Sequence, residues 1–194
     1  MSKKDIPNLL TILRIVFIPV FMLVLIFPLP SDTATRIVAA VLFGLIAVTD
    51  LFDGKLARKY DAVSDFGKFL DPIADKLMII GAMTALISFC GTANGRFNLF
   101  GVLSAFGIYL ILLREFAVTS LRMLAKKSNG KVEGAKLPGK IKTVTQIVFI
   151  LAALLESLIW QIPLLTYLSY ALMLIMTFYS GYTYFAAYAK RNEK

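Results

Sequence analysis

Residues 50–75 read DLFDGKLARKYDAVSDFGKFLDPIAD, and this stretch decides both the fold and the chemistry that the chain supports. It holds six of the twelve acidic residues, although long apolar segments lie on either side of it. Carboxylates at membrane depth are energetically unfavourable, and they are usually functional where they occur. The stretch therefore predicts a polar site at the ends of two membrane-crossing helices.

Outward from this stretch the chain is strongly apolar, with 58% hydrophobic residues among 194 and a mean hydropathy of +0.76. Soluble domains are about 45–50% apolar. The length suits about six spans of roughly 20 residues with short connections. We therefore expect an all-α, polytopic membrane protein in which residues 1–194 form one integral membrane catalytic domain.

The apolar segments and the turn residues between them predict six transmembrane helices. Pro28 and Pro30 end the first, residues 91–95 and 161–163 form outer turns, and Pro72 is expected to bend or loosen the third. Residues 1–7 are expected to lie along the membrane interface. A cleaved signal peptide is the alternative for residues 9–29, but this run is long and no Ala-x-Ala site follows it. The expected helices cover residues 8–27, 35–56, 65–89, 99–126, 140–159 and 164–188.

The positive charge is distributed asymmetrically. The net charge is +9, yet of 21 Lys and Arg residues only Arg36 and Arg96 fall in the expected outer connections. The positive-inside rule then places both termini and the acidic stretch on the cytoplasmic side of the membrane. Basic residues spread between spans argue against a nucleic-acid partner. A bacterial plasma membrane fits the compact chain.

The chain has no histidine, and Cys90 is its single cysteine. An intrachain disulfide, a cysteine-based zinc site and histidine acid–base chemistry are therefore excluded. Any metal must be held by oxygen, which favours Mg²⁺ or Mn²⁺ and is also compatible with Ca²⁺.

Helical spacing places the acidic residues in two stripes, one on each helix. The first contains Asp50 and Asp53, and the second contains Asp71 and Asp75. If the stripes face each other, four carboxylates converge and divalent cations are the natural compensation; two such ions assist phosphoryl transfer in many enzymes. In the alternative interpretation the aspartates cap helices and pair with nearby cations, but this leaves the regular spacing unexplained. Those cations are Lys55, Arg58, Lys68 and Lys76.

The pattern D-x2-D-G-x2-A-R-x8-G-x3-D-x3-D, from Asp50 to Asp75, resembles the signature of the CDP-alcohol phosphatidyltransferase family at every fixed position. The resemblance implies that family's six-helix fold, two bound divalent cations, and attack of an alcohol hydroxyl on the β-phosphorus of a CDP-linked lipid. It implies metal ligands at Asp50, Asp53, Asp71 and Asp75, with Asp75 also the general base. It also implies pairing of the chain into a homodimer. The implied residues of the CDP-lipid site are Gly54, Ala57, Arg58 and Gly67.

A basic group near the expected inner ends of the fourth and fifth spans bears on the acceptor alcohol. An acceptor that carries its own phosphate needs such counter-charge. The group, with its neighbouring residues, also resembles the branch of the family that uses sn-glycerol 3-phosphate and forms phosphatidylglycerophosphate from CDP-diacylglycerol. The candidate phosphate-binding residues are Arg114, Arg122, Lys136, Lys140 and Lys142. For Arg114, pairing with Glu115 and snorkelling to the interface are alternatives.

The start of the first span, Asn8-x2-Thr11-x2-Arg14, resembles the same branch and implies CDP-lipid contacts for Asn8 and Thr11. Helix N-capping is the alternative for Asn8. For the whole chain two alternative functions stand beside this one. The first is the same chemistry with inositol phosphate, serine or phosphatidylglycerol as acceptor. The second is a divalent-cation transporter, although such proteins place their sites near the midplane and often contain repeats.

Overall fold

The computed structural model describes residues 6–59, 65–93, 96–127, 136–159 and 162–192, and most of them are helical. The all-α prediction is confirmed, because in this part of the chain the two strands only close the turn between α3 and α4. The elements are α1 (Ile6–Ile26), α2 (Asp32–Lys59), α3 (Asp65–Cys90), β1 (Thr92–Ala93), β2 (Arg96–Phe97), α4 (Leu99–Lys127), α5 (Lys136–Ile159) and α6 (Leu164–Asn192).

Each of the six helices in the described residues is long and apolar enough to cross a membrane. Large apolar side chains also cover the outside of the bundle, where several are more than half exposed. In water such a surface would drive association, whereas the acyl chains of a bilayer cover it favourably. The prediction of a six-span, multi-pass membrane protein is therefore confirmed. Examples of these side chains are Val16, Phe106, Phe116, Leu168 and Ile175.

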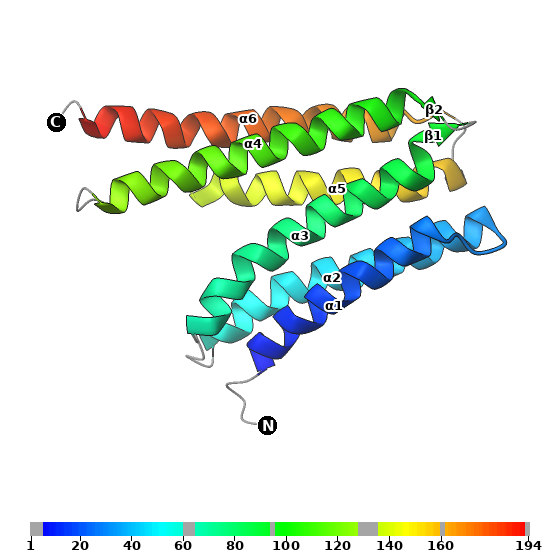
Figure 1. Ribbon diagram of the computed structural model, residues 1–194, viewed down its shortest axis with the longest axis horizontal. Helices are drawn as coiled ribbons and strands as arrows, with labels where there is room; N and C mark the ends of the chain where they lie inside the picture. The colour runs from blue at the N-terminus through cyan, green and yellow to red at the C-terminus, as the bar shows by residue number, and fades with distance from the viewer. Residues whose placement is uncertain (1–5, 60–64, 94–95, 128–135, 160–161, 193–194) are drawn as a thin grey trace.

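The helices form two groups of three, α1 to α3 and α4 to α6 (Figure 1). α1 packs along α2 and α3, and α5 packs along α6. The two groups are joined by contacts of α3 with α4 and α5 and of α2 with α5. α1 begins and α6 ends toward the same end of the molecule, on the left in Figure 1. α2 also ends there and α3 begins there, so we call it the acidic end.

Aromatic contacts hold the helices of each group together. Phe21 of α1 packs on Phe43 of α2 with ring centroids 5.6 Å apart, and Phe149 of α5 packs on Tyr170 of α6 at 5.4 Å. The Tyr170 hydroxyl donates to the Leu103 carbonyl of α4 at 2.6 Å, so its polar tip is satisfied inside an apolar core. This packing fixes the helix axes, and with them the positions of side chains at the acidic end.

Several sequence-based boundaries need correction. α2 runs from Asp32 to Lys59 rather than over residues 35–56, and α6 extends to Asn192 rather than to residue 188. α5 begins at Lys136 rather than at residue 140, because Pro138 falls in the first turn, where its missing N–H costs no helical hydrogen bond. Ile6 and Pro7 already belong to α1, and the interfacial position of residues 1–7 stays a prediction; residues 1–5 lie outside the described residues. α3 is one helix with Pro72 inside it, and the bend expected at Pro72 stays a prediction.

At the opposite end, two glycines let the start of α4 meet the end of α3. A Cβ on Gly91 would lie 2.7 Å from the Gly101 Cα, and a Cβ on Gly101 would lie 2.2 Å from the Gly91 oxygen. Only glycine permits this approach. Asn98 caps α4, since its side chain accepts from the Gly101 N–H at 2.8 Å and donates to the Cys90 carbonyl at 2.7 Å.

Candidate active site

The acidic motif occupies the ends of two helices at the acidic end (Figure 1). Its first five fixed residues lie in the last turns of α2, and Gly67, Asp71 and Asp75 lie in the first turns of α3. The prediction of two helical halves is thereby confirmed. Of the motif side chains the structure describes those of Asp50 and Asp75, so the convergence of all four carboxylates stays a prediction. The structure describes neither the remaining motif side chains nor the surroundings of the two glycines: Asp53, Gly54, Ala57, Arg58, Gly67 and Asp71.

Asp50 is held by a cation from another helix. The Nη1 atom of Arg14, in α1, lies 2.6 Å from Oδ1 of Asp50, and the side chain of Arg14 is only 1% exposed while that of Asp50 is 25% exposed. A buried guanidinium needs such a partner, because an unpaired charge there is strongly unfavourable. The pair therefore orients one carboxylate of the motif, while part of the Asp50 side chain remains exposed.

Asp75 is partly buried and lies within electrostatic range of four other charged groups. These are Lys142 of α5, Asp50 of α2, Glu115 of α4 and Arg14 of α1. Five helices thus contribute charge to one region around the predicted general base. The predicted proximity of the two helical stripes is supported by the interaction between Asp50 and Asp75.

Two of the predicted phosphate-binding residues meet on a single carboxylate. Arg114 Nη1 donates to Oε1 of Glu115 at 2.8 Å, and Lys142 Nζ donates to the same oxygen at 2.5 Å. All three side chains are largely buried, with exposures of 11%, 15% and 8% for Arg114, Glu115 and Lys142. The pairing of Arg114 with Glu115 is one of the alternatives to phosphate binding that the sequence offered for Arg114. The structure adds that Lys142 also pairs with Glu115, and that its charge interacts with Asp75.

The other end of the Arg114 guanidinium reaches α6. Its Nη2 atom donates a hydrogen bond to the Ser180 hydroxyl, and its centre lies 5.7 Å from the ring centroid of Tyr184. Gly181 of α6 lies beside this side chain, and a Cβ there would make ordinary van der Waals contact with Arg114 Cγ at 3.4 Å. Arg114 is therefore oriented by groups from two helices, and its buried Nε makes no hydrogen bond.

The remaining predicted residues have different outcomes. Lys140 is exposed, so it does not join the buried pair of cations. Thr11 is 1% exposed and lies one turn from Arg14 on α1. Asn8 is the third residue of α1, so the N-capping alternative is wrong for it, and its side chain lies outside the described part. The side chains of Arg122 and Lys136 also lie outside that part.

Sequence reasoning missed the roles of Arg14 and Ser180 in this region, and it considered Glu115 only as an alternative partner for Arg114. Arg14 was noted only as the last residue of a short pattern, although a lone arginine within an apolar run already indicates a buried partner. Glu115 carries the same signal, because it is an acidic residue inside a span next to a basic one. Ser180 carried no signal, since a small hydroxyl residue in a transmembrane helix is common.

The donor chemistry fits a divalent cation. Asp50 and Asp75 offer carboxylate oxygens, and hard cations such as Mg²⁺ prefer oxygen ligands. The described residues alone contain no group of three potential metal-binding side chains. The other two predicted ligands, Asp53 and Asp71, have side chains outside the described part of the chain.

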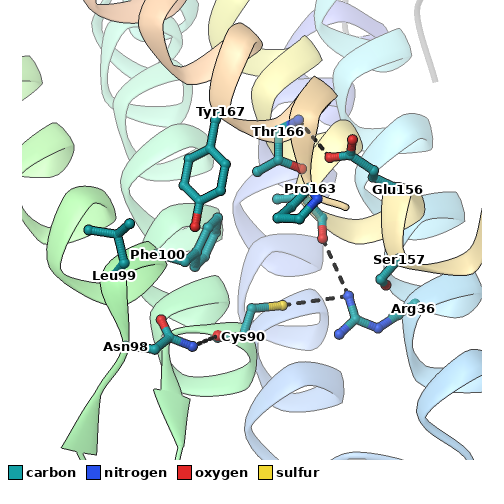
Figure 2. A pocket seen from close by; sticks show the side chains of 11 residues that line it. Arg36, Cys90, Asn98, Leu99, Phe100, Glu156, Ser157, Pro163, Thr166 and Tyr167 are labelled. Atoms are coloured by element: carbon teal, nitrogen blue, oxygen red, sulfur yellow. Dashed lines mark hydrogen bonds between the residues drawn. The ribbon is translucent and has the colours of Figure 1, made fainter. Parts of the chain in front are cut away.

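A polar pocket of about 380 Å³ lies at the opposite end of the bundle, away from the acidic end (Figure 2). In it Arg36 donates to the Cys90 sulfur at 3.7 Å and to the Ala153 carbonyl at 3.3 Å. Glu156 accepts from the backbone N–H groups of Leu165 at 2.5 Å and Thr166 at 2.6 Å, so it caps α6. The carboxylate of Glu156 is thus already used in helix capping and is not available to bind a metal. Arg36, which lines this pocket, precedes Asp50 by 14 residues of α2, a distance of roughly 20 Å along the helix.

Comparison with known proteins agrees with the chemistry at the acidic end. Residues 4–180 match the CDP-alcohol phosphatidyltransferase family. The chain is 35% identical over 193 residues to the CDP-diacylglycerol–glycerol-3-phosphate 3-phosphatidyltransferase of Bacillus subtilis, with 94% of each chain covered. It is 35% identical over 187 residues to the protein of that name from Rickettsia typhi, covering 95% of this chain and 97% of the other.

A probable phosphatidylglycerophosphate synthase of Mycobacterium tuberculosis is 39% identical over 146 residues, which cover 75% of this chain and 64% of that protein. The family match extends from the first helix into the sixth, and it includes the full aspartate motif together with Arg14, Arg114 and Lys142. The chain belongs to the CDP-alcohol phosphatidyltransferase family.

Proposed function

We propose that this protein transfers the phosphatidyl group of CDP-diacylglycerol to sn-glycerol 3-phosphate, giving phosphatidylglycerophosphate and CMP. The names of the relatives from B. subtilis and R. typhi, which align over nearly their whole length, support this reaction. The observation that carries the choice of a phosphorylated acceptor is the buried group of Arg114, Glu115 and Lys142 beside Asp75.

In this proposal the four motif aspartates hold two divalent cations, Mg²⁺ or Mn²⁺. Bound there, such ions supply positive charge that stabilises the attacking and leaving oxygens during phosphoryl transfer. Arg14 orients Asp50 through its 2.6 Å ion pair. The ligands are Asp50, Asp53, Asp71 and Asp75.

Asp75 is the proposed general base. The acceptor's hydroxyl oxygen forms a bond to the β-phosphorus of CDP-diacylglycerol, and the hydroxyl proton passes to the Asp75 carboxylate. The bond between that phosphorus and the oxygen bridging to the cytidylate breaks, and CMP leaves with the electron pair. Proton transfer of this kind is typically worth about 10²–10⁴-fold in rate.

The two substrates approach from different sides of the aspartates. We assign the CDP-lipid to α1, α2 and the start of α3, where small residues leave space and Arg58 offers a fork of donors to phosphate. We assign the phosphate of the acceptor to Arg114 and Lys142, with Arg122, Lys136 and Lys140 as further cations near its path. The CDP-lipid residues are Asn8, Thr11, Gly54, Ala57, Arg58 and Gly67.

The same proposal covers the setting of the enzyme. Residues 1–194 act as one catalytic unit in a bacterial plasma membrane, with both termini and the acidic end facing the cytoplasm, as the positive-inside rule requires. Two copies associate as a homodimer. The lipid donor is a membrane component, whereas glycerol 3-phosphate and CMP exchange with the cytoplasm.

The decisive experiment supplies purified protein with CDP-diacylglycerol, Mg²⁺ or Mn²⁺, and one acceptor at a time. We expect CMP release and a phosphatidylglycerophosphate product with sn-glycerol 3-phosphate alone. Serine, inositol phosphate and phosphatidylglycerol serve as the comparison acceptors. CMP release with one of these and none with glycerol 3-phosphate would keep the family chemistry and overturn the proposed acceptor.

A further inference from the structure

Glu115 is a buried carboxylate that the reaction as described does not use. A single oxygen of it, Oε1, accepts hydrogen bonds from Arg114 on its own helix and from Lys142 on α5. Both cations are largely removed from water, with side-chain exposures of 11% for Arg114 and 8% for Lys142, so water screens their charges poorly. Removal of the negative charge of Glu115 would leave an ammonium and a guanidinium close together without a counter-charge in a poorly hydrated region, where like charges repel strongly.

The charge of Lys142 acts on two carboxylates. Lys142 pairs with Glu115 at 2.5 Å, and it also interacts electrostatically with Asp75. A lysine side chain is a flexible stem with a point charge, so it turns toward whichever anion remains. Loss of the Glu115 charge would therefore direct Lys142 to Asp75, the proposed general base.

We infer that Glu115 is a positioning residue, which holds Arg114 and Lys142 together as the cradle for the acceptor's phosphate and keeps Lys142 from pairing with Asp75. The three side chains carry a net charge of +1 between them, so the cradle remains attractive to a phosphate dianion. Ser180 binds Nη2 of Arg114 and the Tyr184 ring lies beside the guanidinium, while Glu115 binds Nη1. This inference rests on the proposed function.

The test is the steady-state kinetics of Glu115→Gln with each substrate varied in turn. We expect the KM for glycerol 3-phosphate to rise about ten- to a hundredfold, as the loss of a charge-assisted hydrogen bond predicts. The kcat should fall as well, because Asp75 becomes paired with Lys142. The KM for CDP-diacylglycerol should stay within about twofold, since that lipid binds elsewhere. Wild-type values for both substrates would overturn the inference, and so would equal changes in both KM values.

A double-variant comparison separates positioning from a general structural effect. In a Lys142→Gln background there is no ammonium group to turn toward Asp75. Adding Glu115→Gln to that background should therefore lower kcat only slightly further. A kcat loss as large as in the wild-type background would show that Glu115 does not act through Lys142. The matched control is Asp32→Asn, another carboxylate-to-amide change, at an exposed residue of the opposite end.

Glu115→Asp keeps the charge on a shorter stem and should give a KM for glycerol 3-phosphate between those of wild type and Glu115→Gln. It decides the matter if Glu115→Gln yields no folded protein: an unchanged KM for glycerol 3-phosphate, or an equal rise in both KM values, would then overturn the positioning role. The wild-type protein distinguishes this failure from failure of the proposed function. Wild type that is inactive with glycerol 3-phosphate would overturn the acceptor assignment, whereas active wild type with unaffected Glu115 variants would overturn only the positioning role.

Discussion

Arg14 of α1 and Asp50 of α2 are joined by an ion pair of 2.6 Å in which the arginine is only 1% exposed. The first helix therefore does more than anchor the chain, because it orients a carboxylate of the acidic motif from a neighbouring helix. The same helix packs along α3, so its position affects both halves of the motif.

Replacement of Arg14 by Gln should destabilise the fold. Removing one partner of a buried pair leaves the other charge uncompensated, which typically costs about 3–5 kcal/mol. We expect the apparent melting temperature in detergent to fall by several degrees, with Arg14→Lys intermediate. An unchanged melting temperature for Arg14→Gln would show that Asp50 does not depend on this pair.

Asp75→Asn should lose turnover while the protein still binds CDP-diacylglycerol. The amide retains the shape of the side chain but accepts no proton from the acceptor's hydroxyl, so kcat should fall about 10²–10⁴-fold. CMP release measures the turnover, and a thermal shift on adding CDP-diacylglycerol measures binding. A near-normal kcat would refute the base role, and Asp32→Asn is the matched control.

Removal of divalent cations should abolish activity reversibly. A chelator in excess should stop CMP release, and Mg²⁺ or Mn²⁺ should restore it, since oxygen ligands favour hard cations. Bound metal also stabilises the native state by mass action, so the melting temperature of wild type should rise with metal concentration. Asp50→Asn should need more metal for the same rise. Full CMP release in excess chelator would contradict the metal assignment.

Glu156→Ala should lower stability without changing catalysis. Glu156 accepts from two backbone N–H groups at the start of α6, and loss of a helix cap typically costs about 0.5–2 kcal/mol. The melting temperature should therefore fall, while the KM for each substrate and kcat stay at wild-type values. Because the pocket near Glu156 lies far from Asp75, a selective rise in the KM for glycerol 3-phosphate would contradict this separation of the two ends.

Introduced cysteines test the orientation. In a Cys90→Ser background, Ile162→Cys lies on an exposed position of the outer turn and Lys190→Cys lies on an exposed position near the end of α6. A membrane-impermeant maleimide should label the first in intact cells and the second only after lysis. The reverse pattern would overturn the cytoplasmic placement of the acidic end.

Much of the architecture was predictable because it depends on local properties of the chain. Apolar runs of sufficient length must become helices in a bilayer, since no water is present to satisfy the backbone. Pro28, Gly91 and Pro163 mark the turns between such runs, and the observed helices follow them. The start of α5 was missed because Pro138 suggested a loop, although a proline is well accommodated in a first helical turn.

The candidate site divides in the same way. The aspartate spacing and the restriction to oxygen ligands could both be read from the sequence, because helical periodicity is a local property and the absence of histidine is a property of the composition. Only the tertiary structure decided that Arg14 holds Asp50, and that Lys142 and Arg114 meet on Glu115. Glu115 and Lys142 are 27 residues apart and Arg114 and Ser180 are 66 apart. Such contacts depend on how whole helices pack against one another, and this packing is set by side chains distant from the site.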